Sequence, residues 1–334
     1  MRTAWIIALV AAALAVSTTT PAAQTTSRSR GPVVTPLATF GSGLASGSTI
    51  GPDGALYVTD PNAGSVLRVD RRTGTVSTFA DGLPPQVLGV GGAMDVAFIG
   101  RTAYVLVTLV GGDIIGGPHI GDATVGIYRL GRDGNFRVIA DIGGWSIDHP
   151  PTTDHFITTG VQYALQPYGR GFLVTDGHHN RVLRIGLDGT IDELIAFDNI
   201  VPTGLETVGP AVLMAQAGPL PHLPQDGKVV AFWPWSRAPI ELANGASLLV
   251  DIELGRGTEL YALSQGQWDG VAEGSPAVPD TGRLVRVDWH GGLVPIVDRD
   301  GNELVLDRPT SLELVGNTAY VVGLSGTIVR IDNL

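Results

Sequence analysis

The chain has 334 residues, a formal net charge of −11, no cysteine, and Lys228 as its single lysine. Nucleic-acid binding needs clustered basic side chains that contact phosphates, so this composition argues against a nucleic-acid partner. Disulfide bonds and the lipid-modified cysteine of a bacterial lipoprotein are excluded as well. The 46 glycines and 22 prolines separate short apolar runs, a pattern that is typical of an all-β chain.

Residues 1–23 have the pattern of a secretory signal peptide, with a positive start at Arg2, an apolar stretch over 5–16, and small residues before Ala23. We expect cleavage near Ala23, a polar tether over 24–32, and a secreted or periplasmic product. The alternative is an uncleaved membrane anchor, but the apolar stretch is shorter than the roughly 20 residues that span a bilayer. No membrane span is expected after cleavage.

A phrase of four short strands recurs six times over residues 33–334. The clearest copies are LYVTDPNAGSVLRVDRRTGTVSTF (56–79) and FLVTDGHHNRVLRIGLDGTIDELIAF (172–197). A repeat of roughly 40–50 residues with four strands is typical of a β-propeller. We therefore predict an all-β, six-bladed propeller that forms one domain over 33–334, and we expect a monomer.

The strands of each blade are predicted from recurring positions of the phrase. Second strands are predicted over 56–59, 103–108, 172–175, 212–215, 260–263 and 319–322. Third strands are predicted over 66–70, 126–130, 182–185, 229–232, 283–288 and 328–332. Fourth strands are predicted over 76–80, 136–140, 191–197, 240–242 and 293–297. Five third strands carry a central arginine that alternates with apolar residues and should point away from the buried face: Arg68, Arg129, Arg184, Arg286 and Arg330.

The last repeat has no fourth strand of its own before Leu334. The segment Thr39-Phe40-Gly41-Ser42-Gly43-Leu44 echoes Thr78-Phe79-Ala80-Asp81-Gly82-Leu83, which ends the first repeat. Residues 34–40 are therefore predicted to be the outer strand of the last blade, which would close the ring and leave no open edge there.

Loop length separates the two faces of the predicted propeller. Turns between first and second strands, and between third and fourth strands, are short. The long insertions all fall in the other two loop classes, which emerge together on one face: 109–125, 142–161, 216–227, 264–282 and 298–308. Insertions on one face mark the binding face of a repeat protein, so we expect a small-molecule or protein ligand there.

Most of the histidines are predicted on that face. The densest group is Asp176, His178 and His179, and the insertion 142–161 adds aromatic and ionisable side chains at Trp145, His149 and His155. Imidazole, carboxylate and indole around one funnel suit a ligand or a divalent metal ion. The alternative is that these are ordinary polar loop residues and that Asp176 caps its own turn.

The starts of the inner strands should line the central tunnel. They are 46–48, 92–95, 161–163, 202–204, 245–247 and 308–311, and small residues dominate them. The exceptions are Asp95, Gln162 and Arg308. Asp95 facing Arg308 would be either a structural ion pair or a substrate clamp.

The chain resembles the ScyD/ScyE family of exported bacterial proteins, named from the scytonemin pigment gene cluster of cyanobacteria. The matching phrases are GPDGALYVTD (51–60), ADGLPPQVLGVGGAMDVAF (80–98), GVQYALQPYGRGFLVTDGHHNRVLRIGLDG (160–189), IAFDNIVPTGLETVG (195–209) and AGPLPHLPQDGKVVAF (217–232). The blades also resemble NHL repeats, a group related in fold to gluconolactonases and streptogramin lyase. The resemblance implies a six-bladed propeller without a settled reaction.

The enzyme relatives hold a metal ion in the tunnel through Glu, Asn and Asp. Here the predicted inner-strand starts contain no Glu or Asn, and Asp95 is their only acid. One hypothesis is therefore a non-enzymatic propeller that binds a ligand through its long-loop face. The alternative is a lactonase- or lyase-like enzyme that uses Asp176, His178 and His179 with a divalent ion. Three or more of the candidate acids and histidines within coordination distance of one point would favour the enzyme.

Overall fold

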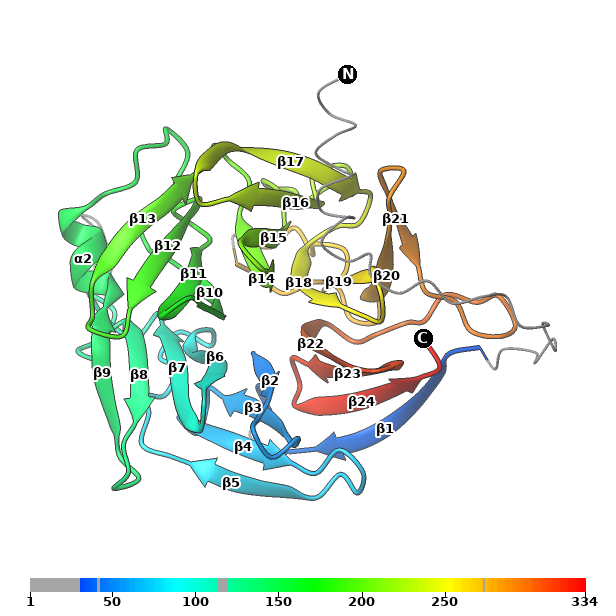
Figure 1. The fold of residues 1–334 in the computed structure, drawn as a ribbon, viewed down its shortest axis with the longest axis horizontal. Helices are drawn as coiled ribbons and strands as arrows, with labels where there is room; N and C mark the ends of the chain where they lie inside the picture. Colours follow the sequence, from blue (N-terminus) through cyan, green and yellow to red (C-terminus); the bar gives the residue numbers. More distant parts are fainter. Residues whose placement is uncertain (1–30, 41–42, 113–118, 273) are drawn as a thin grey trace.

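The computed structural model describes residues 31–40, 43–112, 119–272 and 274–334. These residues form β-sheets that are arranged around a ring, and they contain one short helix (Figure 1). The fold is therefore all-β and propeller-like. The predicted signal peptide and nearly all of the tether fall in 1–30, outside the described residues. Within the described ranges, no helix is long and apolar enough to cross a membrane.

Three sheets are each made of four consecutive antiparallel strands. The first contains β2 (Ser48–Ile50), β3 (Leu56–Asp60), β4 (Ser65–Val69) and β5 (Val76–Ala80). The second contains β6 (Gly92–Ile99), β7 (Thr102–Thr108), β8 (Gly126–Leu130) and β9 (Phe136–Asp141). The third contains β10 (Gln162–Tyr168), β11 (Gly171–Asp176), β12 (Arg181–Gly186) and β13 (Ile191–Ala196).

An eight-stranded sheet follows along the chain. One half contains β14 (Pro202–Val208), β15 (Ala211–Gln216), β16 (Lys228–Trp233) and β17 (Ser236–Asn244). The other contains β18 (Leu249–Leu254), β19 (Leu260–Ser264), β20 (Arg283–Asp288) and β21 (Gly292–Pro295). Asn244 of β17 pairs in parallel with Gly292 of β21, and this one residue pair joins the halves. Each half is thus an antiparallel meander like the sheets before it.

The last sheet combines the two ends of the described chain. It contains β22 (Pro309–Val315), β23 (Thr318–Gly323), β24 (Thr327–Asp332) and the N-terminal strand β1 (Val33–Thr39). β1 runs antiparallel to β24, with Val33 opposite Asp332 and Thr39 opposite Thr327. The predicted outer strand over 34–40 is therefore confirmed, one residue earlier than expected.

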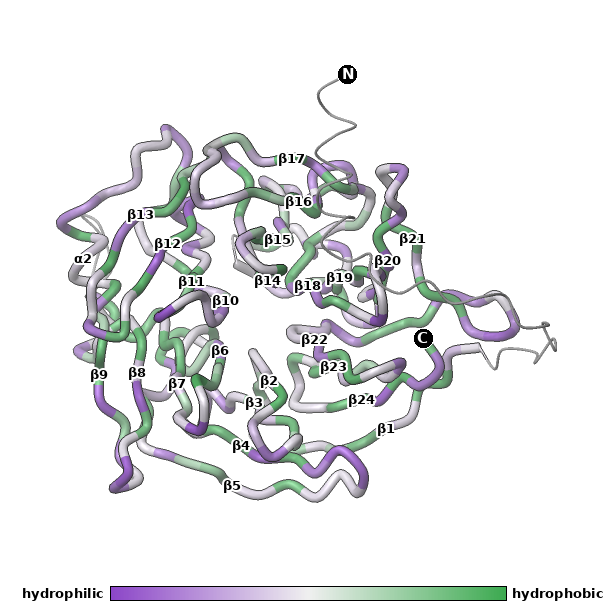
Figure 2. Tube along the Cα trace, in the orientation of Figure 1, coloured by the Kyte–Doolittle hydropathy of each residue, from purple (hydrophilic) through white to green (hydrophobic). Residues whose placement is uncertain are grey.

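The inner strands contact one another in sequence around the centre of the ring. β2 is followed by β6, β10, β14, β18 and β22, and β22 returns to β2 (Figure 1). The hydrophobic core lies between neighbouring sheets, where Tyr57 and Val66 of one sheet pack with Val96 and Val105 of the next. Hydrophobic residues accordingly follow the strands, while hydrophilic residues gather at the turns (Figure 2). The arginine of the third strands lies outside this core, as Arg184 shows by its exposure.

Besides β1, four outer strands differ from their predicted bounds: β9 ends one residue later and β13 one residue earlier than predicted, and β17 and β21 differ for local reasons. β17 begins at Ser236, because Trp233 pairs with Ser236 in a tight hairpin. Pro239 does not end the strand, since proline is tolerated where no neighbour needs its missing N–H. β21 ends at Pro295, because the chain then folds back and Val297 forms a bridge with Glu303.

The insertion 142–161, predicted as a loop, begins with the helix α2 (Ile142–Asp148). Its two glycines have low helix propensity, so no helix was predicted from this segment. The Asp141 carboxylate caps the helix by accepting from the Gly144 N–H (2.8 Å), and Ile142 and Ser146 are buried. Capping and tertiary packing therefore outweigh propensity here.

Candidate ligand-binding site

A cavity of about 280 Å³ lies at the centre of the ring, between the inner strands. Five carboxyl side chains line it, and we call it the acidic channel: Asp95, Glu206, Asp251, Glu253 and Glu313. Its lining residues include no Arg, Lys or His. The channel therefore gathers acidic side chains without a basic partner in its own wall.

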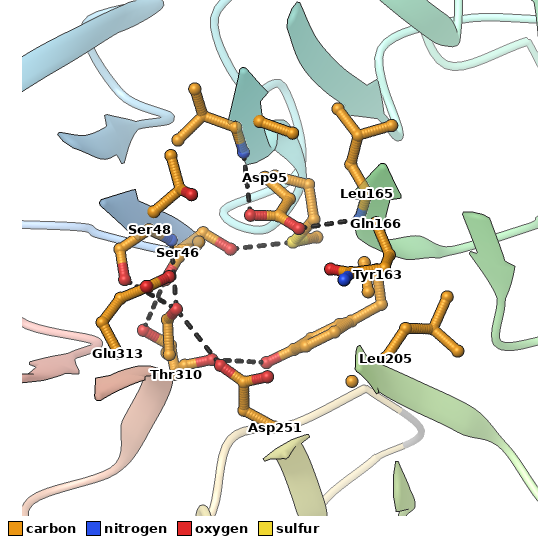
Figure 3. Close-up of a pocket in the computed structure, with 18 of the residues that line it drawn as sticks. Ser46, Ser48, Asp95, Tyr163, Leu165, Gln166, Leu205, Asp251, Thr310 and Glu313 are labelled. Atoms are coloured by element: carbon orange, nitrogen blue, oxygen red, sulfur yellow. Dashed lines mark hydrogen bonds between the residues drawn. The ribbon is translucent and has the colours of Figure 1, made fainter. Parts of the chain in front are cut away.

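Asp95 and Asp251 bridge neighbouring inner strands in the same way, and both side chains lie in the wall of the cavity (Figure 3). Asp95 accepts from the backbone N–H of Val96 (2.8 Å) and, across the strand boundary, from that of Leu165 (2.7 Å). Asp251 accepts from Ile252 N–H (2.8 Å) and from Leu312 N–H (2.7 Å). The two aspartates lie on β6 and β18, three positions apart in the ring. Each one ties its strand to the next.

The three glutamates lie on the inner strands β14, β18 and β22, and only Glu253 shares its strand with a channel aspartate. Residues two apart on a strand point to the same side, which places Glu253 in the channel below Asp251. Glu206 and Glu253 are hydrogen-bonded to each other, and the amide of Gln166 lies 3.5 Å from Glu206 Oε1. Gln166, Glu206 and Glu253 therefore form one group of polar side chains in the channel.

Burial raises the pKa of these carboxyls above ordinary values. It raises the pKa of Asp95 well above the usual range, although backbone N–H donors act in the other direction. It raises the pKa of Asp251 to about 7. For Glu253 and Glu313, burial raises the pKa strongly and the neighbouring carboxylates raise it further. The channel is therefore a set of neighbouring acids whose pKa values are all raised by burial, that of Asp251 to about 7.

Tyr163 lies across the upper end of the acidic channel. Its side chain extends from β10 to the far wall, where the hydroxyl donates to the carbonyl oxygen of Thr310 on β22 (3.1 Å; Figure 3). Burial, together with the charges of Asp251 and Asp95, raises the pKa of Tyr163, so the phenol stays neutral. Tyr163 is thus an uncharged side chain that spans the channel between two opposite inner strands, β10 and β22.

A second cavity of about 160 Å³ adjoins the first on the long-loop face, and we call it the mouth pocket. Three of the long insertions contribute to it, through Ile157, Leu220 and Ser275 among others. Its wall is predominantly apolar and includes Val161, Val201, Leu248 and Val250. Tyr163 and Val250 line both cavities, so the mouth pocket and the acidic channel meet at Tyr163.

Two histidines add polar atoms to the mouth pocket. His178 Nδ1 lies 3.0 Å from the carbonyl oxygen of Thr159. His222 is buried, its Nδ1 lies 3.3 Å from Ala217 O, and its ring meets Trp268 edge to face. Burial lowers the pKa of His222, which keeps it neutral at neutral pH. The predicted ligand residue His178 therefore lies in a pocket of the expected face.

His179 and Asp176 do not form the exposed rim that the sequence suggested. Both are fully buried: His179 Nδ1 donates to Asp176 Oδ2 (2.8 Å), and Arg181 Nε donates to the same oxygen (2.9 Å). These contacts hold the pKa of Asp176 below its usual value despite burial. The rim prediction was wrong for this pair, because the following Arg181 turns inward and recruits the aspartate. His179 Nε2 is buried without a hydrogen-bond partner among the described residues.

The insertion 142–161 lies beside this group rather than across the funnel from it. Arg181 stacks over the Trp145 ring (4.9 Å to its centroid) and donates to the carbonyl of His149 (2.8 Å). His149 in turn stacks on Trp145, with 4.4 Å between ring centroids. His155 is exposed, and its carbonyl accepts from Asn180. Arg181 therefore holds the insertion 142–161 against the sheet that contains β12.

The other two tunnel candidates have structural contacts. Gln162 is buried and joins Thr108 (2.7 Å) to Asp176 (2.9 Å). Arg308 Nε pairs with the adjacent Asp307 (3.0 Å), and the expected ion pair with Asp95 is not formed. Asp95 is satisfied by backbone N–H groups, which leaves no reason for the arginine to turn toward it.

The candidate residues do not fit a metal ion in this arrangement. No group of three or more His, Cys, Asp or Glu residues in the described ranges is placed to hold one. Asp176 is committed to Arg181 and His179, and the channel aspartates are committed to backbone N–H donors. The convergence that would favour a metal enzyme is therefore not found among the candidate acids and histidines of the described chain. These are Asp95, His149, His155, Asp176, His178 and His179.

Four channel acids were missed at the level of sequence. The inner strand β18 begins at Leu249 rather than at 245–247, which brings Asp251 to the level of Asp95. The glutamates were missed because only strand starts were considered. A usable signal was present: Gly204-Leu205-Glu206 and Ser311-Leu312-Glu313 share one pattern, and Asp251-Ile252-Glu253 repeats it.

No family model matches the chain, and no curated protein is detectably similar to it in sequence. Solved structures with a similar fold are found. A gluconolactonase from Xanthomonas campestris has a TM-score of 0.57 at 13% identity, over 93% of both chains. Virginiamycin B lyase from Staphylococcus aureus, solved as an inactive variant with quinupristin, has a TM-score of 0.51 at 12% identity, over 90% of this chain and 99% of the lyase.

The PQQ-bound aldose sugar dehydrogenase from Streptomyces coelicolor is similar to the same degree. Its TM-score is 0.53 at 13% identity, over 90% of this chain and 98% of the dehydrogenase. At such identities the likeness concerns the fold alone. A lactonase, a lyase and a dehydrogenase share this fold, so function must be argued from the site.

Proposed function

We propose that the chain is an exported, six-bladed β-propeller of the ScyD/ScyE type that binds a small apolar molecule in its mouth pocket. Two observations support the blade number. The eight-stranded sheet divides into two meanders at one residue pair, Asn244 with Gly292, and the inner strands of the six meanders follow one another around the ring.

The mouth pocket is the observation that carries the binding proposal. An apolar cavity of about 150 Å³ is large enough to hold benzene, and the mouth pocket has about 160 Å³. An apolar wall with a few polar atoms, here from His178 and His222, is the usual form of a small-molecule site. The ligand class is therefore a small apolar or aromatic molecule.

Isothermal titration with 2-phenylethanol, a neutral probe of suitable size, tests this function. We expect a weak interaction, since so small a ligand has little binding energy to offer. Val161→Trp fills the pocket and should weaken binding at least tenfold, or by about 1.4 kcal/mol. Leu187→Trp also introduces a tryptophan, but at an exposed turn outside the pocket, and should bind like the unmodified protein. His290→Ala, in a short turn, is expected to have no effect either. The function is overturned if 2-phenylethanol does not bind, or binds equally to a folded Val161→Trp protein.

A lactonase- or lyase-like enzyme is the second candidate, and it is supported by the fold that the chain shares with a gluconolactonase and virginiamycin B lyase. Metal analysis of the purified protein, followed by a gluconolactone hydrolysis assay with and without a chelator, tests it. Metal at one equivalent and chelator-sensitive hydrolysis would replace the binding function with the enzymatic one.

Export and the monomeric state belong to the same proposal. Cell fractionation should recover the protein outside the cytoplasm with an N-terminus near Gln24, and size-exclusion chromatography should give the mass of one chain. Recovery of an intact N-terminus in the membrane fraction would support the uncleaved anchor instead.

A further inference from the structure

The mouth pocket and the acidic channel differ sharply in character although they adjoin. The mouth pocket has an apolar wall, whereas the channel directly behind it is lined by five carboxyls. Tyr163 and Val250 belong to both walls. A ligand seated in the mouth pocket therefore has its inner end at Tyr163, facing a cavity of opposite polarity.

The wall of the acidic channel supplies no basic side chain to pair with its carboxyls. Asp95 and Asp251 are hydrogen-bonded to backbone N–H groups, and Glu206 to Glu253, but no basic side chain is among the lining residues. Ionising a buried carboxyl without a counter-charge is costly, and a cationic group brought into the cavity would favour the ionised form. About 280 Å³ of space is present for such a group.

The Tyr163 side chain, which lies between the mouth pocket and the acidic channel, is compatible with entry of a cation. Tyr163 is held at its hydroxyl by one hydrogen bond, to the carbonyl of Thr310. A single neutral hydrogen bond is a weak restraint compared with a charge-assisted one. The histidine beside the entrance, His222, is buried and neutral, so it does not repel a positive charge.

We propose that the two cavities form one site for an amphipathic organic cation, with an aromatic or apolar body in the mouth pocket and an ammonium group beyond Tyr163 in the acidic channel. The inference rests on the proposed function, because it uses the mouth pocket as the seat of the apolar part. The inference adds three points to the proposed function. The ligand is a cation, its charged end lies toward the channel and its apolar end in the mouth pocket, and the channel carboxyls select it.

Three matched series of probes separate the two claims: phenylalkylamines, phenylalkanols and phenylalkanoates with one to four methylene groups, titrated at pH 7.5. The amines are cationic at this pH. With the longer chains, each amine should bind at least tenfold more tightly than the alcohol of equal length, or by about 1.4 kcal/mol. The carboxylates should bind more weakly than the alcohols. The advantage of the amine should be absent for one methylene group and appear as the chain passes Tyr163.

Two channel variants locate the charge. Glu253→Gln combined with Glu313→Gln removes two carboxylates and should reduce the advantage of the amine while leaving the alcohols unchanged. Gln166→Lys places a cation beside Glu206, which accepts from Gln166 at 3.5 Å in the parent protein, and should remove the same advantage. Gln166→Met controls for loss of the amide, and Asp300→Asn controls for loss of an exposed carboxylate.

The outcomes are distinct. Alcohols that bind without any preference for amines overturn this inference and leave the proposed function standing. Absence of binding by all three series overturns both. An amine preference that is equal at every chain length, or that survives in a folded Gln166→Lys protein, places the cation outside the channel and overturns the inference.

Discussion

Gly47 lies directly against Asp95, so that a methyl group at Gly47 would lie 2.7 Å from the Asp95 Cα atom. Gly204 has the same relationship to Asp251, at 2.5 Å from its Cα atom. Each aspartate is thus held between a glycine of the preceding inner strand and the N–H donor of the following one. The arrangement occurs twice around the ring, three strands apart.

Gly47→Ala and Gly204→Ala should each destabilise the protein. The added methyl group meets backbone atoms, which must shift, and overpacking of this kind costs about 1–3 kcal/mol. Urea unfolding followed by circular dichroism measures the loss. Gly292→Ala is the matched control, because nothing lies within 4 Å of its added methyl group. Equal stability of all three variants would contradict the close packing.

Stability should fall as pH rises from about 5 to 8. In the folded protein the pKa of Asp251 is about 7 instead of 3.8, and burial raises the pKa of Asp95 in the same direction. A raised carboxyl pKa means that the folded state binds more protons than the unfolded state. This contribution is fully present below the unfolded pKa and is lost as pH rises through the folded one.

Urea unfolding at pH 5, 6, 7 and 8 measures this dependence. Asp251→Asn should flatten it, whereas Asp300→Asn at the surface should not. His222 acts in the opposite direction, since burial lowers its pKa and the unfolded state then gains protons below about pH 6.5. A free energy of unfolding that rises steadily from pH 6.5 to 8 would contradict the raised pKa values of the channel acids.

Arg181→Met should destabilise the protein by about 3–5 kcal/mol, because it leaves Asp176 buried without its ionic partner. Arg184→Met on the same strand changes an exposed arginine and should stay within about 0.5 kcal/mol. Adding Asp176→Asn to Arg181→Met should cost less than the sum of the two single changes. Strict additivity in this double-mutant cycle would indicate that the pair does not interact.

A chain that begins at residue 43 should melt many degrees below one that begins at residue 31. Only the longer chain keeps β1, and without it β24 becomes an exposed edge strand. Thermal unfolding of both purified chains measures the difference. Identical melting curves would mean that the last sheet does not need its N-terminal strand.

The strand pattern of this fold was predictable, since apolar alternation and glycine turns recur with each repeat. Strands β5, β8 and β20 begin and end at the predicted residues. The closing role of β1 was also visible, because its flanking residues echo an earlier repeat. Helix α2 was not, because its stability comes from the Asp141 cap and tertiary burial rather than from its own composition.

The site was predicted less well than the fold, for a physical reason. His179 belongs to a loop phrase that looks solvated, and only the inward turn of Arg181 buries it. Conversely, Glu253 and Glu313 look like exposed strand residues, yet the ring turns them toward its axis. Which side of a strand faces solvent depends on all six inner strands together, and a local pattern does not contain that information.

The pairing of β1 with β24 also determines when folding of the ring can be completed. The two partners come from opposite ends of the described chain, so the last sheet cannot form until the final strand has been delivered. Contacts this distant in sequence are formed late and slowly. Under the export proposed above, assembly of the ring would follow translocation. Until then the waiting strand needs protection from association with other chains.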